Sequence, residues 1–355
     1  MSIFVSVASY RDDACTNTIN SLYETADDPK RVFVGICQQN KDDDTDCILN
    51  TKFENHPNIR VMRLPHTEAK GPTYARYLCS TLWKGEDYFF QVDSHSSFVE
   101  GWDTKCISML DEIRSKGLSN KPILSHYPLE DKDYKNRKQN RTQVPRICKS
   151  YFTDKGIISM HAAEIIDTKD EYYQVPYVSG GMLFGPSSML IEVPYDPNLP
   201  YLFTGEEILH SLRLYTAGYD IFTPKENIIF HEYIREEKPK FWTDLSYDDT
   251  EALSKVKYFL GLAQLNTLSE AMRKDLDKFG LRETRSLRNF LDWTKIDIDK
   301  KEVGSNFCND NNEASDKDIK ESNELKENYF CITCKDAKTR NKMTVLVAVL
   351  ALVII

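Results

Sequence analysis

The amino-acid sequence predicts an α/β fold in which one sheet carries helices on both of its faces. The first observation is an alternation, from residue 2 to residue 128, of short apolar runs with segments of helical periodicity. Strands that alternate with helices are joined by crossovers and lie parallel, so both faces of the sheet become covered. The second observation is length, because 355 residues with 41% hydrophobic content can bury the core of one large or two medium domains.

The N-terminal part of the chain divides into predicted strands and helices in order. Strands are expected where apolar residues alternate or run without interruption, at residues 2–10, 31–39, 58–65, 88–93 and 122–128. Helices are expected from their periodicity at residues 14–26, 71–85 and 101–117. Gly71 and Pro72 suit the start of the second helix, and Gly117 suits the end of the third.

The following residues are less regular. Residues 129–150 are charged and weakly periodic, which predicts a surface loop or a mobile flap. Gly180 and Gly181 precede a strand within residues 177–190, where they either let the backbone approach a ligand or form a plain bulge. The remaining predicted elements are an amphipathic helix within 205–224 that Gly218 closes, a short strand that ends at His231, and helices within 240–297.

Composition limits the class of partner and the compartment. The formal net charge is -9 and the pI is about 5.4, whereas nucleic-acid binding needs a basic face, so no nucleic-acid partner is expected. An anionic ligand must be held by local cations or by a metal ion. Nine cysteines, several of them inside apolar elements, favour a reducing compartment over a disulfide framework. The N-terminal residues lack the features of a signal peptide, so we expect a cytoplasmic protein.

Two segments follow the predicted domain of residues 1–297. Residues 298–342 are polar and poor in large apolar side chains, which is typical of a disordered linker. Residues 343–355 form an apolar run that suits a short membrane anchor facing the cytosol, although a full span needs about 20 apolar residues. Interfacial insertion and non-native sequence are the alternatives. Cys331 and Cys334 have metal-binding spacing but no second ligand pair nearby.

Polar side chains lie where three of the predicted strands end. The residues are Ser9, Tyr10 and Arg11 after the first strand, Gln38 and Gln39 after the second, and Asp93, Ser94 and His95 after the fourth. In sheets of this type the ligand binds beyond the carboxyl ends of the strands, so we expect these residues at one ligand site. Taken alone, Asp93 and Ser94 would be explained equally well as a helix cap or a turn.

Other ionisable residues are predicted to reach the same edge. Glu206 and Glu207 occupy the first turn of a helix, where the macrodipole alone favours acids, and His231 ends a strand. Together with Asp93 and His95 they form a mixed set of carboxylates and imidazoles. Such a set suits Mn²⁺ or a similar divalent ion better than Ca²⁺, which prefers oxygen ligands.

The order of these motifs resembles a known family. The stretches are "IFVSVASYRDDACTNTINSLYETADDPKRVFVGICQQN", "GPTYARYLCSTLWKGEDYFFQVDSHSSFVEGWD", "SGGMLFGPS", "FTGEEILHSLRLYTAGYD" and "FHEYIR". They resemble the glycosyltransferase family typified by the cytosolic enzyme that adds N-acetylglucosamine to hydroxyproline on a ubiquitin-ligase adaptor. The "DSH" and "GEE" elements are also similar to those of the mucin-type polypeptide N-acetylgalactosaminyltransferases. The resemblance covers most of residues 2–297 and implies a single catalytic domain of the GT-A type, which binds a nucleotide sugar.

The resemblance also implies roles for individual residues. Asp93, His95 and His231 would hold Mn²⁺ or Mg²⁺ against the diphosphate of a UDP-sugar. Arg11 and Arg76 would contact the nucleotide or its phosphates, and Ser9, Tyr10, Gln38, Ser94, Gly180 and Gly181 would line the same site. Glu206 or Glu207 would bind the sugar or the acceptor, and the mucin-type enzymes read G-E-D where this chain reads Gly205, Glu206, Glu207. Trp102 would either line the pocket or belong to the core.

The activity that the resemblance implies is transfer of N-acetylglucosamine, or another N-acetylhexosamine, from UDP to a hydroxyl group with retention of configuration. The acceptor would be hydroxyproline, Ser or Thr of a protein, and a glycan or a lipid-linked molecule is the alternative. A metal-dependent phosphohydrolase would need ligands for two ions, and only one set is visible. A catalytically silent nucleotide-sugar-binding protein would be expected to have lost members of that set.

Overall fold

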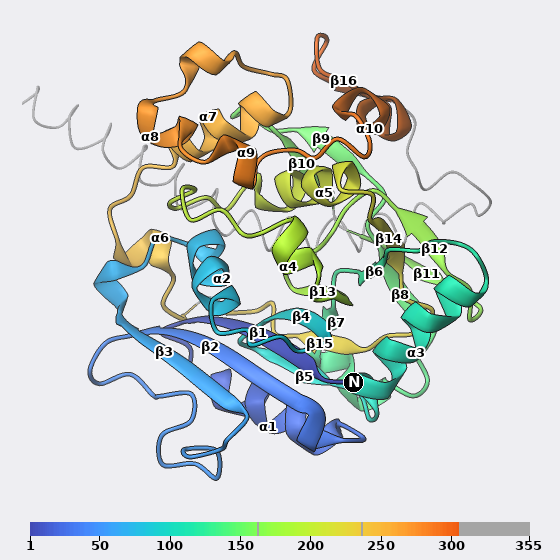
Figure 1. Cartoon of the computed structure of the whole chain (residues 1–355). Coiled ribbons are helices and arrows are strands. Elements are labelled where there is room, and N and C mark those ends of the chain that lie inside the picture. The colour runs from blue at the N-terminus through green and yellow to red at the C-terminus, as the bar shows by residue number, and fades with distance from the viewer. Residues whose placement is uncertain (162, 236, 305–355) are drawn as a thin grey trace, which may run out of the picture.

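The computed structural model describes residues 1–161, 163–235 and 237–304. Its centre is an eight-stranded sheet (Figure 1). In spatial order the strands are β12 (Tyr173–Val175), β14 (Asp220–Thr223), β6 (Pro122–Ser125), β13 (Met182–Pro186), β4 (Tyr88–Asp93), β1 (Ile3–Tyr10), β2 (Val32–Asn40) and β3 (Ile59–Pro65). The sheet is mixed, because β13 runs antiparallel to β4 and β6, and β12 runs antiparallel to β14. The five strands predicted within residues 2–128 do run parallel, because β4 and β6 both lie antiparallel to β13, which lies between them. The α/β class is therefore confirmed, and the antiparallel strands β12 and β13 come from residues beyond 128.

The two faces of the sheet are covered by different helices. On β1, Ile3, Val5 and Val7 pack into the core that includes α1 (Cys15–Thr25) and α3 (Trp102–Ser115). Phe4 points to the other face, toward the core that includes α4 (Met189–Glu192) and part of α5 (Glu206–Thr216). The helix α2 (Pro72–Ser80) packs on this second face against Ala8 and Cys37. Figure 1 shows α1 on one side of β1 and β2, with α2, α4 and α5 on the other.

Smaller sheets surround the large one and replace the loop that was predicted at residues 129–150. They are β5 (Ser96–Phe98), β15 (Ile229–His231) and β7 (Leu129–Glu130); β8 (Gln143–Arg146) with β11 (Glu164–Asp167); and β9 (Ser150–Phe152) with β10 (Ile158–Met160). Short 3-10 turns occur at Pro29–Arg31, His66–Glu68, Asp131–Asn136 and Leu265–Thr267. The sequence of residues 129–150 predicts a loop or flap rather than strands because each of its strands is too short to show a period of two.

Short helices form the C-terminal part, as predicted for residues 240–297. They are α6 (Phe241–Asp244), α7 (Thr250–Phe259), α8 (Glu270–Arg273), α9 (Leu276–Phe279) and α10 (Leu287–Thr294). They are followed by a hairpin of β16 (Ile296–Asp297) and β17 (Glu302–Val303), so ordered structure extends past residue 297. The rest of the predicted linker and the apolar run 343–355 lie outside the described residues. Among the described helices, none has the length and apolar character that a bilayer crossing requires.

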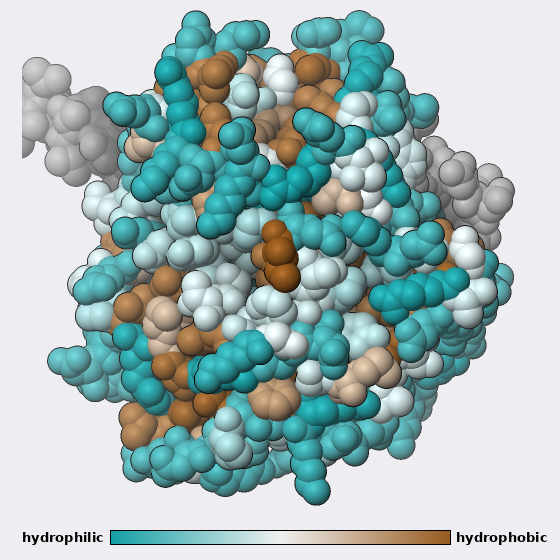
Figure 2. Space-filling view, viewed as in Figure 1, coloured by the Kyte–Doolittle hydropathy of each residue, from teal (hydrophilic) through white to brown (hydrophobic). Residues whose placement is uncertain are grey.

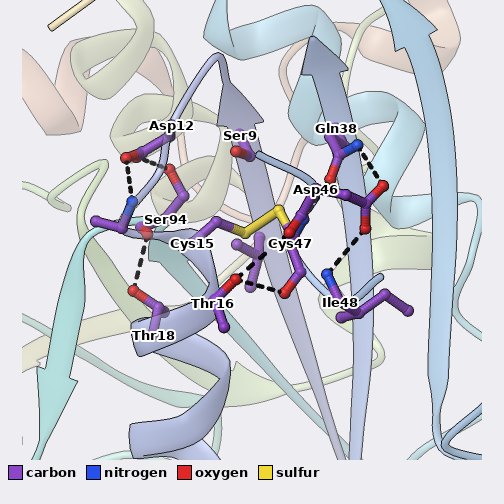
Figure 3. The surroundings of a disulfide bond; sticks show 12 residues. Ser9, Asp12, Cys15, Thr16, Thr18, Gln38, Asp46, Cys47, Ile48 and Ser94 are labelled. Atoms are coloured by element: carbon purple, nitrogen blue, oxygen red, sulfur yellow. Dashed lines mark hydrogen bonds between the residues drawn. A yellow bond between two sulfur atoms is a disulfide. The ribbon is translucent and has the colours of Figure 1, made fainter. Parts of the chain in front are cut away.

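Cys15 and Cys47 form a disulfide, which the cysteine distribution did not predict. The loop after β2 folds back over the start of α1, so two cysteines 32 positions apart become neighbours (Figure 3). Cys37, Cys79 and Cys106 are free and buried. The cysteine pattern favours reduced thiols over a disulfide framework, and the Cys15–Cys47 bond departs from that expectation.

On the surface shown in Figure 2, hydrophilic side chains predominate and apolar side chains gather in separate groups. This agrees with the charged composition of the chain. Many of the apolar residues are buried in the cores on the two faces of the large sheet.

Candidate active site

A cavity of about 360 Å³ lies beyond the carboxyl ends of β1 and β4. Ten of the residues predicted from the sequence line it, namely Tyr10, Arg76, Asp93, Ser94, His95, Gly180, Gly181, Glu206, Glu207 and His231. The cavity is therefore lined by residues of the strands β1 and β4, of the helices α2 and α5, and of the small sheet that contains β15.

Strand register brings the two histidines together across 136 positions of sequence. β15 pairs antiparallel with β5, and His231 lies opposite Ser96, the residue after His95. The backbone N–H of Glu232 donates to the carbonyl of His95 at 3.0 Å. As a result the imidazole rings of His95 and His231 lie 4.4 Å apart between centroids.

Asp93 completes a cluster with the two histidines. It ends β4, and its register partner on β1 is Ala8, which packs against α2, so the Asp93 side chain lies on the α2 face. One potential ligand atom from each of Asp93, His95 and His231 lies within 4.8 Å of the others. Oδ2 of Asp93 is 3.2 Å from Nε2 of His231.

Arg76, from α2, is buried and connects Asp93 to the acidic helix start. Its Nη2 donates to Oδ1 of Asp93 at 3.1 Å and to the carbonyl of Gly180 at 2.9 Å. Its Nη1 donates to Glu206. One guanidinium thus holds the end of β4, the Gly180 backbone and the first turn of α5 in a fixed relation.

The neighbouring acids of α5 have different partners. Glu207 is fully engaged: Oε1 accepts the backbone N–H of Gly180 at 2.8 Å, and Oε2 accepts the hydroxyl of Tyr127 at 2.7 Å. Glu206 pairs with Arg76, and its second carboxylate oxygen accepts no hydrogen bond from the described residues. Glu207 therefore supports the glycine backbone, and Glu206 is the acid with capacity for a ligand.

Electrostatics keeps this cluster in a metal-binding form. Burial alone would raise the pKa of Asp93, but the hydrogen bond with His231 and the charge of Arg76 lower it well below the ordinary value. Burial lowers the pKa of His231 to about 4, with the charge of His95 adding to the effect. At neutral pH the carboxylate is therefore anionic and the His231 imidazole is neutral, which are the forms that bind metals.

The structure places Ser9 and Gln38 away from the cavity. Ser9 and Gln38 are register partners that lie on the opposite face from Tyr10 and Gln39. Gln38 bonds to Asp46 and to the backbone of Cys47, as Figure 3 shows. Because side chains alternate along a strand, Gln39 lines the cavity instead.

Arg11 and Trp102 also differ from the prediction of ligand contact. Arg11 is not among the cavity-lining residues and pairs instead with Asp44 at 2.8 Å and Asp244 at 2.7 Å. Trp102 is fully buried in the core, where its ring packs on Phe90. The core interpretation of this tryptophan is the correct one.

Sequence reasoning missed Asp12, Arg235 and a group of aromatic residues that line the cavity. Asp12 accepts from Nδ1 of His95 at 2.7 Å and pairs with Arg235 at 2.7 Å. Burial opposes the charge of Asp12, yet the hydrogen bond and charge of His95 lower its pKa to about 2. Position alone could have identified Asp12, because it is an acid just after the first parallel strand. The aromatic residues Phe203, Phe241 and Trp242 carry no comparable signal.

Comparison with known proteins gives a family and a fold. The family model described as glycosyltransferase (GlcNAc) matches residues 2–57 and 50–300. No curated protein matches the chain by sequence. The structure of GalNAc-T7 with UDP, GalNAc and Mn²⁺ matches with a TM-score of 0.54 and 14% identity, over 82% of this chain and 56% of that one. The chain thus spans little more than half the length of that neighbour.

A second structural neighbour is more distant. The structure of S. aureus TarS 1-349 with UDP-GlcNAc matches with a TM-score of 0.46 and 15% identity, over 78% of this chain and 73% of that one. The mixed sheet, the order of elements and the GalNAc-T7 match confirm the predicted GT-A fold.

Proposed function

Because the chain belongs to the GlcNAc glycosyltransferase family, we propose that it transfers N-acetylglucosamine, or another N-acetylhexosamine, from a UDP-sugar to a hydroxyl acceptor in a reaction that depends on Mn²⁺ or Mg²⁺. The observation that carries the proposal is the convergence of Asp93, His95 and His231 in one cavity with Arg76 and Glu206. Family membership supplies the reaction class, and the cavity supplies groups suited to it.

The residues present fit a divalent ion. One carboxylate and two imidazoles from three chain segments place their ligand atoms within 4.8 Å of one another. Carboxylate and imidazole ligands suit Mn²⁺, and Mg²⁺ fits less well because it prefers oxygen. When bound, such an ion acts as a Lewis acid that offsets the negative charge of a diphosphate leaving group. GalNAc-T7 was solved with Mn²⁺, UDP and GalNAc, which supports the same ion and nucleotide for this chain.

Protein cations in the cavity would complement the ion. Arg76 and Arg235 line the cavity, and both side chains are mostly shielded from solvent. Arginine suits phosphate because its planar guanidinium presents several donors at once. Arg76 is already oriented by Asp93, Glu206 and Gly180, so little ordering entropy remains to be lost on binding.

Glu206 is the acid that we assign to sugar or acceptor hydroxyls, since one of its oxygens has capacity for a ligand. We assign Glu207 the role of holding the Gly180 backbone in place. We propose retention of configuration, in which the leaving phosphate takes the acceptor proton and no protein base is needed. If the reaction inverts configuration instead, Glu206 would be the candidate base.

The acceptor would lie along the apolar part of the cavity. Phe203, Phe241 and Trp242 form one aromatic group, with ring centroids 5.1 Å apart for both the Phe203–Trp242 and the Phe241–Trp242 pairs. Apolar side chains of β10 and the segment before β11, Ile158, Met160 and Ala163, also line the cavity. These surfaces favour an acceptor that presents apolar groups beside its hydroxyl, as a protein hydroxyproline, Ser or Thr segment or a glycan does.

The test is a donor screen on the full chain. Release of UDP or GDP is measured with a panel of UDP- and GDP-sugars, with Mn²⁺, with Mg²⁺ and with EDTA, for the wild type and for Asp93→Ala. We expect turnover of a UDP-N-acetylhexosamine that needs the metal and that Asp93→Ala abolishes. Asp292→Ala, at an exposed acid paired with Arg288, is the matched control and should retain activity. Reaction of GDP-sugars alone would refute the donor, and full activity of Asp93→Ala would refute the metal set.

A further inference from the structure

The Asp12 carboxylate is buried next to the cluster of proposed metal ligands, with 2% of the residue exposed. Its Oδ2 accepts from Nδ1 of His95 at 2.7 Å and from the hydroxyl of Ser94 at 2.5 Å. Its Oδ1 accepts the backbone N–H of Ala14 at 3.0 Å and lies 2.7 Å from Nη2 of Arg235. Both oxygens are therefore occupied, which makes Asp12 unsuited to bind a ligand directly.

The contact with His95 determines where that imidazole carries its proton. An ionised carboxylate can only accept hydrogen bonds, so the proton of a neutral His95 must lie on Nδ1. The lone pair is then left on Nε2, and that nitrogen becomes the available ligand atom. A carboxylate in this position also raises the basicity of the imidazole and fixes the orientation of the ring.

We propose that Asp12 is a positioning residue that holds His95 as the Nδ1–H tautomer, so that Nε2 is presented for a divalent ion. The proposal rests on the proposed function, because it assumes that His95 is a metal ligand. It goes further by assigning a role to a residue that touches neither the ion nor the substrate.

Neighbouring contacts fix the carboxylate and the turn that it serves. Ser94, which shares Oδ2 with His95, also has its carbonyl bound by the hydroxyl of Thr18 at 2.8 Å, and Figure 3 shows this chain of contacts from Asp12 to α1. Arg235 follows His231 by four positions. Through its two oxygens, Asp12 therefore connects the turn that carries His95 with the segment that follows His231.

A purely structural role is the competing explanation. Asp12 also accepts the Ala14 N–H just before α1, and aspartate often supports such a turn. Asp12→Asn separates the two roles, since the Asn carbonyl can still accept from Ala14. The amide is neutral and can turn its NH₂ toward His95, so it no longer enforces the Nδ1–H tautomer.

The first measurement is Mn²⁺ affinity without nucleotide, from the electron paramagnetic resonance signal of free Mn²⁺, on the wild type and Asp12→Asn. We expect the variant to bind Mn²⁺ about 10- to 100-fold more weakly. Asp13→Asn is the matched control, because Asp13 is the adjacent acid, is half-exposed and pairs with Lys238 at 2.6 Å. Asp13→Asn should bind Mn²⁺ like the wild type.

The second measurement is the tautomer itself, from long-range ¹H–¹⁵N correlations of metal-free protein labelled at histidine. The His95 signal is assigned by its loss in His95→Gln. We expect the Nδ1–H form in the wild type and a shift toward the Nε2–H form in Asp12→Asn. The wild-type measurement needs no Asp12 variant, so it decides the question even if Asp12→Asn fails to fold.

The outcomes separate the two proposals. An Nε2–H tautomer in the wild type, or a folded Asp12→Asn with wild-type Mn²⁺ affinity, overturns the role of Asp12 while leaving the proposed function in place. Absence of any Mn²⁺ binding by the wild type refutes the metal-dependent function instead. A change in thermal stability without a change in Mn²⁺ affinity or tautomer would show that Asp12 serves only the turn.

Discussion

Arg76 and Asp93 form an ion pair that uses only one side of the carboxylate. Nη2 of Arg76 lies 3.1 Å from Oδ1, whereas Oδ2 faces Nε2 of His231 at 3.2 Å. The cation on one side offsets the charge of Asp93, and the other oxygen remains directed toward the second imidazole. The pair therefore presents a preformed anionic ligand rather than one that must lose a proton on binding.

This geometry predicts that Arg76→Lys fails despite its retained charge. A lysine has one ammonium group and cannot reproduce the planar fork that contacts Asp93, Glu206 and the Gly180 carbonyl together. We expect kcat to fall by about 10²- to 10³-fold, as for loss of a preorganised donor. Initial rates of UDP release check this. The control is Arg288→Lys, at an exposed arginine on α10, and equal losses in both variants would contradict the prediction.

The glycine pair before β13 predicts two distinguishable effects. A Cβ at Gly181 would lie 3.2 Å from Oδ2 of Asp93, whereas a Cβ at Gly180 would lie 3.1 Å from Nη2 of Arg76. We therefore expect Gly181→Ala to weaken Mn²⁺ binding more than Gly180→Ala does, and Gly180→Ala to affect kcat more. Titration of Mn²⁺ and steady-state kinetics measure both effects. Equal Mn²⁺ affinities in the two variants would show that the Asp93 carboxylate moves aside without cost.

The two acids at the start of α5 predict opposite consequences for catalysis and stability. Glu206→Gln removes the charge that faces Arg76 and the ligand, so kcat should fall by at least tenfold with little change in thermal midpoint. Glu207→Gln weakens the contacts with Gly180 and Tyr127, so its main effect should be a lower midpoint. Kinetics and differential scanning fluorimetry on both variants make the comparison. If Glu207→Gln loses more activity than Glu206→Gln while staying folded, the assignment is reversed.

The central sheet and its helices could be predicted because their signals are local. The segments YFFQVD and IFVSVASY are continuous enough to identify strands, and periodicity identified α1, α2 and α3. The antiparallel direction of β13 could not be predicted, because direction depends on how Met182–Pro186 pairs with β4 and β6. The strands between residues 129 and 167 could not be predicted for a related reason, since strands of two to four residues form only through pairing with their partners.

Site residues could be predicted from the sequence where their place depends on a strand end. The prediction failed where it depends on the direction of a side chain. Asp93, His95 and His231 each end or follow a strand, and the structure brings them together. Ser9 and Gln38 also lie at strand ends, but alternation points them to the other face. A choice between Gln38 and Gln39 requires knowledge of which face carries the cavity, and no residue of β2 encodes that by itself.

A buried histidine of α5 predicts a pH effect on stability. His210 stacks on Tyr195 at 5.1 Å, and burial lowers its pKa to about 3. Below about pH 6.5 the unfolded state binds a proton at His210, whereas the folded state binds that proton only below about pH 3. Its contribution to stability is therefore present above pH 6.5 and is lost as the pH falls, by about 1.4 kcal/mol per pH unit. His210→Phe should reduce the slope of denaturation midpoint against pH between 7 and 5, and an unchanged slope would contradict this.

Lys255 and Asp196 form a buried ion pair. Removal of one partner is predicted to lower stability strongly, and removal of both charges is predicted to restore most of it. Nζ of Lys255 lies 2.6 Å from Oδ2 of Asp196, and the two side chains are 0% and 1% exposed. The pair joins α7 to the segment between α4 and α5, and the next residue of α7, Val256, packs against Gly205 at the start of α5. It thus anchors the C-terminal helices beside the acids of the site.

Removal of one partner leaves the other charge buried and unpaired, which typically costs about 3–5 kcal/mol. Lys255→Met should therefore lower the denaturant midpoint strongly, because the Asp196 carboxylate loses its cation. The double variant Lys255→Met with Asp196→Asn removes both charges of the pair, and it should recover most of the loss because neither of the two is left charged without its partner. Guanidinium unfolding of the wild type, the two single variants and the double variant gives the coupling energy. Additive losses in the double variant would mean that packing of the lysine stem, rather than the charge pair, stabilises this junction.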